Sequence, residues 1–289
     1  MSEVILITGA AGGIGQCLCR QLIQRDVQLI LADRDAERLQ ALCVSLGERA
    51  TSFALDLTDE QQIETLVAFI GERFGRLDAL INNAAIVHVE PFATRSNASI
   101  RRELEINLLA PLLLTRQAVG LLEASRNARV VSTVSIAGIF PTAESPIYSA
   151  SKFGLRGAML SLALELEPLG IRVSCVLPSA TDTPMLRQEA IDGGNALQFM
   201  DPPQAPEAVA RNIEHMLDKP KLESAPKRSE LWLTKLVMLF PNLLPRLLPL
   251  FQRRGERGKQ RYLQGLEARG LAKCKDGAWQ LIPEQQTSL

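Results

Sequence analysis

Short apolar runs alternate with longer helical patterns along the first two thirds of the chain. The runs of strand length cover residues 4–8, 27–33, 50–56, 77–82, 129–135 and 172–178. Apolar positions at helical spacing fill the stretches between them, up to Arg25 and over 35–46, 59–74, 98–125 and 147–168. Continuous apolar strands that alternate with helices are typical of a parallel sheet covered on both sides. The pattern predicts an α/β fold, a Rossmann-like doubly wound parallel sheet with helices on both faces.

The alternation ends near Lys219, where prolines, charges and a very apolar stretch follow. We therefore expect a dinucleotide-binding catalytic domain over residues 1–218 and an α-rich C-terminal appendage over 219–289. Near the end of the chain, residues 273–282 alternate around Asp276-Gly277, which is a strong turn signal and predicts a small hairpin.

The apolar stretch 231–251 carries Lys235, Arg246 and three prolines, which argue against a membrane span. It predicts two short helices broken near Pro241 and is followed by a basic run over 252–261. The side chains expected on a common apolar surface are Trp232, Leu236, Leu239, Leu243, Leu247 and Leu250. A lid over a substrate cleft, a subunit contact and a membrane-surface segment over 231–261 all remain open.

Composition narrows the class of protein. The chain has 289 residues, is 46% hydrophobic and carries no formal net charge, which argues against a general nucleic-acid binder. Its five cysteines form no even set and follow no zinc spacing, as expected for a reducing cytoplasm. The two histidines suggest no metal site, and the start of the chain lacks the pattern of a signal peptide. We expect a cytoplasmic protein, with contact at a membrane surface as the alternative.

A glycine-rich turn, TGAAGGIG at 8–15, follows the first predicted strand and opens a helix. Glycines let the backbone approach a diphosphate closely, and the N-terminus of the helix supplies amide donors. Asp33 ends the second predicted strand, where a carboxylate binds a ribose 2′-hydroxyl and repels a 2′-phosphate. Arg34 is a guanidinium that favours the phosphate. Together these residues favour NAD over NADP.

The segment YSASK at 148–152 places Tyr148 and Lys152 one helical turn apart. An ammonium beside a phenol is expected to lower the pKa of the phenol and to make it a proton donor near neutral pH. An exposed helix pair without a function is the alternative interpretation of these five residues.

Several motifs in order resemble the short-chain dehydrogenase/reductase family over about residues 1–215. The sequence has the cofactor loop TGxxxGxG at 8–15, Asp56 in LDL, NNAA at 82–85, Asn107, Ser135, YxxxK at 148–152 and PSATDTP at 178–184. Ser179 and Ala85 stand where the family has glycine, and no glycine-rich VDGG-like tail follows. Only the weak segment 221–226 stands where the seventh strand is expected.

The resemblance implies hydride transfer between a nicotinamide and an alcohol or ketone. It implies four catalytic residues: Tyr148 as general acid and base, Lys152 on the nicotinamide ribose, Ser135 on the substrate oxygen, and Asn107 holding a water. The cofactor-binding residues that it implies are Gly9, Gly13, Ile14, Gly15, Asp33, Arg34, Asp56, Leu57, Asn83, Tyr148, Lys152, Pro178, Thr181 and Thr183.

The partner expected for such a protein is a small lipophilic alcohol or ketone, because an apolar lid and a membrane location both suit one. The resemblance also implies a homo-oligomer, a dimer or a tetramer. The rival hypotheses are a dinucleotide-binding scaffold with little turnover and a peripheral membrane protein.

Overall fold

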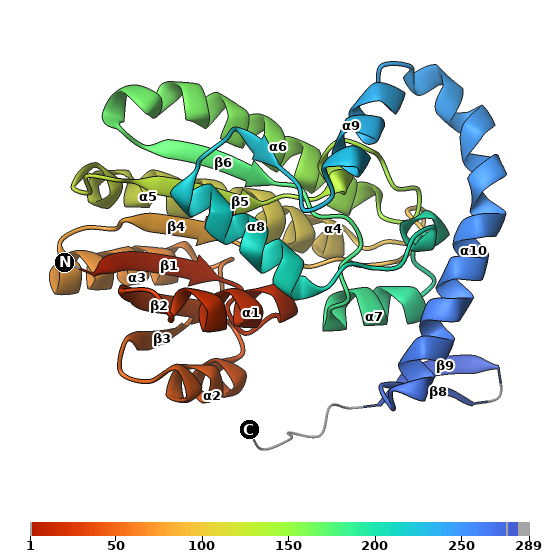
Figure 1. The fold of residues 1–289 in the computed structure, drawn as a ribbon, viewed down its shortest axis with the longest axis horizontal. Coiled ribbons are helices and arrows are strands. Elements are labelled where there is room, and N and C mark those ends of the chain that lie inside the picture. The colour runs from red at the N-terminus through yellow and green to blue at the C-terminus, as the bar shows by residue number, and fades with distance from the viewer. Residues whose placement is uncertain (1, 276, 283–289) are drawn as a thin grey trace.

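One parallel sheet organises the part of the chain that the computed structural model describes, residues 2–275 and 277–282. Its strand order is β3-β2-β1-β4-β5-β6-β7 (Figure 1). The strands are β1 (Glu3–Thr8), β2 (Val27–Asp33), β3 (Ala50–Ala54), β4 (Ala79–Asn82), β5 (Arg129–Thr133), β6 (Arg172–Val176) and β7 (Glu223–Ser224). The predicted doubly wound fold is confirmed, and the first six strands lie within or within one residue of the apolar runs that predict them.

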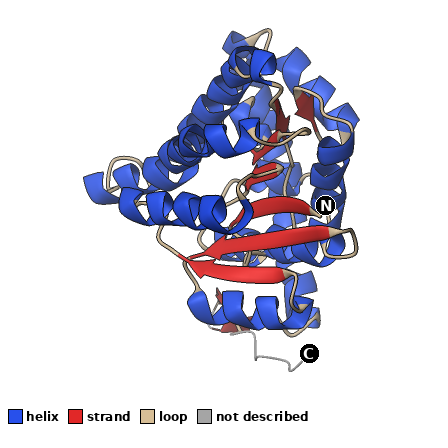
Figure 2. Ribbon diagram, turned by 90° about the vertical axis from the view of Figure 1, so that its left-hand side faces the viewer, coloured by secondary structure: helices blue, strands red, loops and turns tan. Residues whose placement is uncertain are grey.

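Helices cover both faces of the sheet (Figure 2). Side chains along β1 alternate between the two cores, with Ile5 and Ile7 in one and Val4 and Leu6 in the other. The first core includes α1 (Gly13–Leu22), α2 (Ala36–Leu46) and α8 (Pro206–Asp218). The second includes α3 (Glu60–Phe74), α5 (Ala110–Glu123) and α6 (Pro146–Glu165). A sheet buried on both faces leaves its strand ends as the place for a ligand.

The helical pattern predicted over 98–125 forms more than one helical element. It consists of α4 (Asn97–Leu104), a π-helical turn η1 (Glu105–Leu109) and α5. Pro111 has no N–H to donate to the carbonyl four residues earlier. The amide of Ala110 donates to the carbonyl of Glu105, five residues earlier, which is the hydrogen bond of a π-helix. Such turns are frequent at functional sites, and this one contains Asn107.

The C-terminal part is largely helical. Its elements are α7 (Pro184–Ile191), η4 (Ala196–Phe199), α9 (Arg228–Val237), η5 (Pro241–Leu243), α10 (Leu244–Ala268), β8 (Ala272–Lys275) and β9 (Ala278–Leu281). β8 and β9 pair antiparallel, so the predicted hairpin forms; Asp276 of its turn lies outside the described residues. β7 lies just beyond the boundary predicted at 218, and the division of the chain into two domains stays a prediction.

The predicted break near Pro241 is present, but the second helix is not short. α10 runs from Leu244 to Ala268 with Pro249 inside it. A proline this near the start of a helix removes only one internal hydrogen bond, so the helix continues through it. Among the described residues, no single helix is long and apolar enough to cross a bilayer. α9 and the stretch 241–268 meet that requirement only as a pair, and they are bent by 87° at the break.

Two glycines fix the lower part of α10 against η4. A Cβ atom on Gly258 would lie 1.8 Å from the carbonyl oxygen of Phe199, and one on Gly255 would lie 2.4 Å from that of Ala196. Only glycine permits this approach of helix to backbone. Leu263 and Leu266 of α10 then share a small core with Leu186, Ala190, Phe199 and Ala272. The base of α10 is therefore held firmly to the main body.

Candidate active site

A pocket of about 990 Å³ lies at the carboxyl ends of the parallel strands. Its lining runs from Asp33, at the end of β2, to Val237, Leu244 and Leu248 on α9 and α10. The predicted cofactor residues that line it are Gly9, Gly13, Ile14, Asp33, Arg34, Asp56, Leu57, Asn83, Tyr148, Lys152, Pro178, Thr181 and Thr183. Gly15 packs behind the glycine turn instead, and Asn107 is fully buried behind the pocket wall.

The glycine turn has the shape of a cradle for a diphosphate. Gly9 has φ +65°, and a Cβ atom there would lie 2.7 Å from the Cα of Ala84. α1 begins at Gly13 with no side chain capping its N-terminus and no acidic residue in its first turn. Its first amides therefore remain available to an anion, and the positive end of the helix dipole faces the same way. This turn fits the phosphates of a dinucleotide.

Asp33 fixes the turn next to that cradle. One carboxylate oxygen accepts from the amide of Ala11 at 3.0 Å, and the other accepts from the amide of Asp35 at 3.1 Å. Arg34 and Arg38 line the pocket close by. The negative charge of Asp33 and the positive charges of Arg34 and Arg38 therefore lie together, at the place where folds of this kind bind the 2′ position of a ribose.

Asp56 and Asn83 organise the loops after β3 and β4. The carboxylate of Asp56 accepts hydrogen bonds from the backbone amide and the hydroxyl of Thr58. The hydrogen bond from the backbone amide makes the largest contribution to lowering the pKa of Asp56. Asn83 donates its side-chain amide to the carbonyl oxygens of Thr8 and Gly9, each at 3.2 Å. Asn83 thus joins the end of β4 to the glycine turn, which places the two predicted binding segments side by side.

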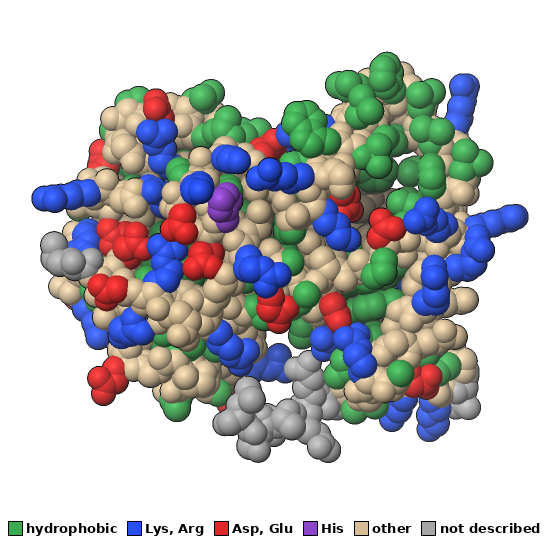
Figure 3. Space-filling view, viewed as in Figure 1, with side chains coloured by type: hydrophobic (Ala, Val, Ile, Leu, Met, Phe, Trp, Pro, Cys, Tyr) green, Lys and Arg blue, Asp and Glu red, His purple; other side chains and the backbone are tan. Residues whose placement is uncertain are grey.

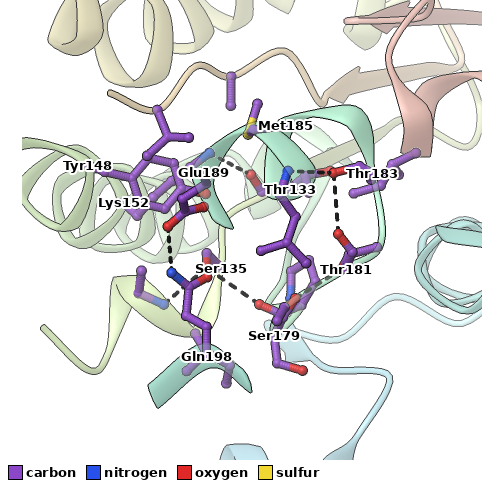
Figure 4. A pocket seen from close by; sticks show the side chains of 18 of the residues that line it. Thr133, Ser135, Tyr148, Lys152, Ser179, Thr181, Thr183, Met185, Glu189 and Gln198 are labelled. Atoms are coloured by element: carbon purple, nitrogen blue, oxygen red, sulfur yellow. Dashed lines mark hydrogen bonds between the residues drawn. The ribbon is translucent and has the colours of Figure 1, made fainter. Parts of the chain in front are cut away.

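Tyr148 and Lys152 lie one turn apart on α6, as the sequence predicts, and both line the pocket (Figure 4). The Lys152 ammonium donates to the carbonyl oxygen of Thr133 at 3.0 Å. Its Nζ lies 5.6 Å from the centre of the Tyr148 ring. Lys152 is 1% exposed, so its charge is almost completely removed from water.

The expected lowering of the Tyr148 pKa is wrong for this structure. Burial raises the pKa of the phenol, the negative charge of Glu189 adds to the increase, and a hydrogen bond with Ser135 opposes it. Burial also lowers the pKa of Lys152 to about 8, and the negative charge of Glu103 opposes that change. The physical reason is desolvation, which disfavours the charged form of each group more than their neighbours favour it. The phenol is therefore protonated at neutral pH.

Ser135 and Asn107 flank this pair differently. Ser135 lies two residues beyond β5, where its hydroxyl accepts from the amide of Ala137 at 3.0 Å and faces the pocket. Asn107 exchanges two hydrogen bonds of 2.8 Å with the backbone of Ile86 and donates to the Ser151 hydroxyl at 3.3 Å. Asn107 therefore positions the loop after β4 against α6, and three of the four predicted catalytic residues line the pocket.

The segment after β6 closes the pocket over the glycine turn. Thr183 caps α7 by accepting from the amide of Leu186 at 3.4 Å, and its hydroxyl also donates to the carbonyl of Thr181 at 3.3 Å. Gln204 donates to the Thr181 hydroxyl at 3.3 Å and to the carbonyl of Ser179 at 3.2 Å. These bonds hold the pocket wall that begins at Pro178.

Glu189 is a buried acidic residue of the pocket that the sequence did not single out. It lies on α7, is 8% exposed, and receives a hydrogen bond from Gln198 of η4 (Figure 4). Burial raises the pKa of its carboxyl group, and Lys259 of α10 opposes that increase. In the sequence it looks like an ordinary glutamate of a surface helix. Its tertiary position, beside Tyr148, places a buried carboxyl group in the pocket wall.

The chain belongs to the short-chain dehydrogenase/reductase family. The family model described as "short chain dehydrogenase" matches residues 3–192. Momilactone A synthase of Oryza sativa subsp. japonica is 33% identical over 190 residues, which are 65% of this chain and 69% of that protein. The protein is therefore an oxidoreductase of this family, as the motifs predicted.

Solved structures agree with the sequence relatives. A short-chain dehydrogenase from Streptomyces avermitilis has a TM-score of 0.73 and 26% identity, covering 86% of this chain and 97% of its own. A metagenomic short-chain oxidoreductase, solved in complex with NADP, has a TM-score of 0.65 and 28% identity, covering 77% of this chain and 94% of its own. The long α10 and its hairpin lie beyond the residues that the family model matches.

Proposed function

We propose that the protein interconverts a lipophilic alcohol and its ketone with NAD(H), using Tyr148 as general acid and base. The observation that carries the proposal is one continuous pocket. Its cofactor part is formed by the glycine turn and Asp33, Tyr148 and Lys152 lie within it, and apolar side chains of α9 and α10 complete it. A hydride donor and an apolar substrate would meet beside Tyr148.

Each residue has a task in this reaction. When bound, the nicotinamide supplies or accepts the hydride. In reduction, the Tyr148 hydroxyl gives its proton to the substrate oxygen as that oxygen gains negative charge; in oxidation it takes the proton from the alcohol. Ser135 donates a hydrogen bond to the same oxygen. Lys152 would hold the cofactor ribose, and its positive charge would stabilise the phenolate that remains after proton transfer.

The raised pKa of Tyr148 makes the phenol a weaker acid in the free protein, which bears on both directions of the reaction. The phenol stays protonated in the free enzyme at neutral pH, as a phenol of ordinary pKa also does. The negative charge of Glu189 acts in the same direction. We infer that binding of cofactor and substrate must lower the pKa of Tyr148 before it transfers a proton efficiently in either direction.

The substrate preference follows from the pocket wall. Leu233, Val237 and Leu248 come from helices outside the region that the family model matches, and they add apolar surface to the pocket. Burying one methylene group stabilises a complex by about 0.8 kcal/mol, or about fourfold in affinity. A substrate chain that extends along this wall should therefore gain specificity with each methylene.

The test is a series of methyl ketones of increasing length, reduced with NADH. We expect kcat/KM to rise by about fourfold per added methylene until the wall is covered. Leu248→Ser is the control variant, because it makes one position of the wall polar while leaving the cofactor residues untouched. It should flatten the increase for long ketones and leave short ones unchanged. A flat series in the unmodified protein would contradict a lipophilic substrate.

The choice of NAD over NADP is also part of the proposal. Asp33 presents a carboxylate at the end of β2, and a 2′-phosphate there would meet like charge. Arg34 and Arg38 would attract that phosphate, but Asp35 forms an ion pair with Arg38 at 3.5 Å. Because Asp35 partly neutralises Arg38, the negative charge of Asp33 is opposed mainly by Arg34.

Asp33→Ala should reverse the preference between the cofactors. We expect affinity for NADH to fall by about tenfold and affinity for NADPH to rise, because the repulsive charge is gone while Arg34 remains. Fluorescence titration with both cofactors measures the effect. Asp33→Asn is the control, since it removes the charge but keeps a hydrogen-bond acceptor for the turn. Tighter binding of NADPH by the unmodified protein would show that the arginines dominate.

A further inference from the structure

The most conspicuous unexplained surface lies where α9 turns into α10. The hydrophobic side chains gathered there are each 58 to 72% exposed; they are Trp232, Leu233, Leu236, Leu239, Phe240 and Leu250. We call this set the apolar tip. Figure 3 shows hydrophobic side chains over this turn, at the upper end of α10. A patch of this kind on one chain marks an interaction site.

Positive charge surrounds the apolar tip. Residues 227–261 contain nine Lys and Arg side chains and only two glutamates, although the whole chain has no net charge. No acidic residue occurs between 231 and 255. Arg246 and Arg253 are exposed along α10, whereas Arg254 pairs with Asp201; Figure 3 shows Lys and Arg side chains beside the hydrophobic ones there. An apolar surface bordered by cations complements an anionic bilayer.

We propose that the apolar tip inserts into the interface of a membrane that contains anionic lipids. The hydrophobic side chains would lie among the acyl chains, and the arginines of α10 would meet the phosphates. The 87° bend presents one turn to the membrane rather than a span. The lower part of α10 is fixed to η4 through Gly255 and Gly258, so the tip is held out from a rigid base.

A second copy of the chain fits this surface less well. A twofold axis through the apolar tip would pair this surface with a copy of itself that carries the same excess of Lys and Arg over acidic residues. Like charges placed together at an interface oppose association. Anionic head groups, in contrast, neutralise these same residues, so charge favours lipid as the partner.

Docking would also place the pocket against the bilayer. Leu233, Leu247 and Phe251 are exposed on the outside and also line the pocket. They form an apolar connection between the tip and the site beside Tyr148. This step rests on the proposed function: a lipophilic alcohol or ketone dissolved in the membrane would enter the pocket without crossing water.

Flotation with lipid vesicles tests the docking directly and needs no activity. The full-length protein should float with phosphatidylcholine vesicles that contain phosphatidylglycerol, and less with phosphatidylcholine alone. The double variant Leu236→Glu and Leu239→Glu should reduce binding by at least about tenfold, because two charges enter the apolar interface. Leu164→Glu is the matched control: this leucine is 76% exposed on α6, and its variant should float like the unmodified protein.

Two further measurements keep the result decisive. Circular dichroism and turnover of a short, water-soluble ketone should be unchanged in the double variant, because neither leucine lines the pocket. Equal flotation of the double variant and the unmodified protein would overturn the proposal. Failure of the unmodified protein to bind vesicles would also overturn it. If the double variant then converted a larger assembly into a smaller one, the apolar tip would be a contact between copies.

Discussion

Tyr148→Phe should reduce turnover by about three orders of magnitude and change the affinity for dinucleotide by less than about threefold. Positioned acid–base catalysis contributes typically about 10²–10⁴-fold. The variant removes only the hydroxyl, and the ring still fills its buried space. Steady-state kinetics with NADH and a ketone measures the turnover, and titration of the cofactor measures the affinity.

Tyr262→Phe is the natural control for this experiment. Tyr262 is the only other tyrosine of the chain, and its hydroxyl donates to Asp182 at 2.7 Å. Asp182 lines the pocket, but Arg187 and Arg269 also hold its carboxylate. Loss of one of these bonds should leave turnover within about threefold. Comparable turnover in the unmodified protein and the Tyr148→Phe variant would remove Tyr148 from the mechanism.

The fold was predictable because its signals are local. Apolar runs such as 27–33 have the length of a strand, and their continuous apolar character matches a strand covered on both faces of a sheet. The spacing of Tyr148 and Lys152 likewise requires only that the segment be helical. The glycine turn and Asp33 meet because β1 and β2 are neighbouring parallel strands whose carboxyl ends share one edge.

Features that depend on distant partners were not predictable. A π-helical turn and an α-helix have the same apolar pattern in the sequence, so the turn at Asn107 was not visible there. The side chain of Asn107 bonds the backbone of Ile86, 21 residues away. Gly258 looks like a helix breaker in the sequence. It is instead the point where α10 approaches the carbonyl of Phe199, inside a helix that runs to Ala268.

The electrostatics of the site show the same limit. From the sequence, Lys152 is expected to lower the pKa of Tyr148, since only their separation is visible. The structure adds the burial of both groups and the charge of Glu189, which reverse the sign for the phenol. The spacing therefore identifies which side chains meet, whereas the depth of the pocket determines which protonation state each one holds.

Burying the charge of Lys152 should lower the free energy of unfolding, while the same charge is needed for turnover. Lys152→Met should lower turnover by at least about 10²-fold, since the cation beside the phenol is lost. It should also raise the free energy of unfolding at neutral pH, by about 1–2 kcal/mol. This value reflects the cost of burying the ammonium, partly offset by the lost hydrogen bond to Thr133.

The pH dependence distinguishes this explanation from simple repacking. The pKa of Lys152 falls from 10.5 to about 8 on burial. Between these values the unfolded chain binds a proton that the folded protein has released, so the stability of the unmodified protein rises with pH across this window. The advantage of Lys152→Met should therefore be full below about pH 8 and shrink towards pH 10.5. Thermal unfolding of both proteins across this range measures it.

Lys152→Ala is the control that separates charge from volume. It removes the same charge but leaves a cavity in the wall behind Tyr148, so its stability should fall below that of the Met variant at every pH. The difference between the Ala and Met variants should not depend on pH, because neither titrates. The contrary result is a Met variant that is less stable than the unmodified protein by a constant amount from pH 7 to pH 10. It would mean that the buried ammonium is fully stabilised by its hydrogen bonds and that its pKa is not lowered.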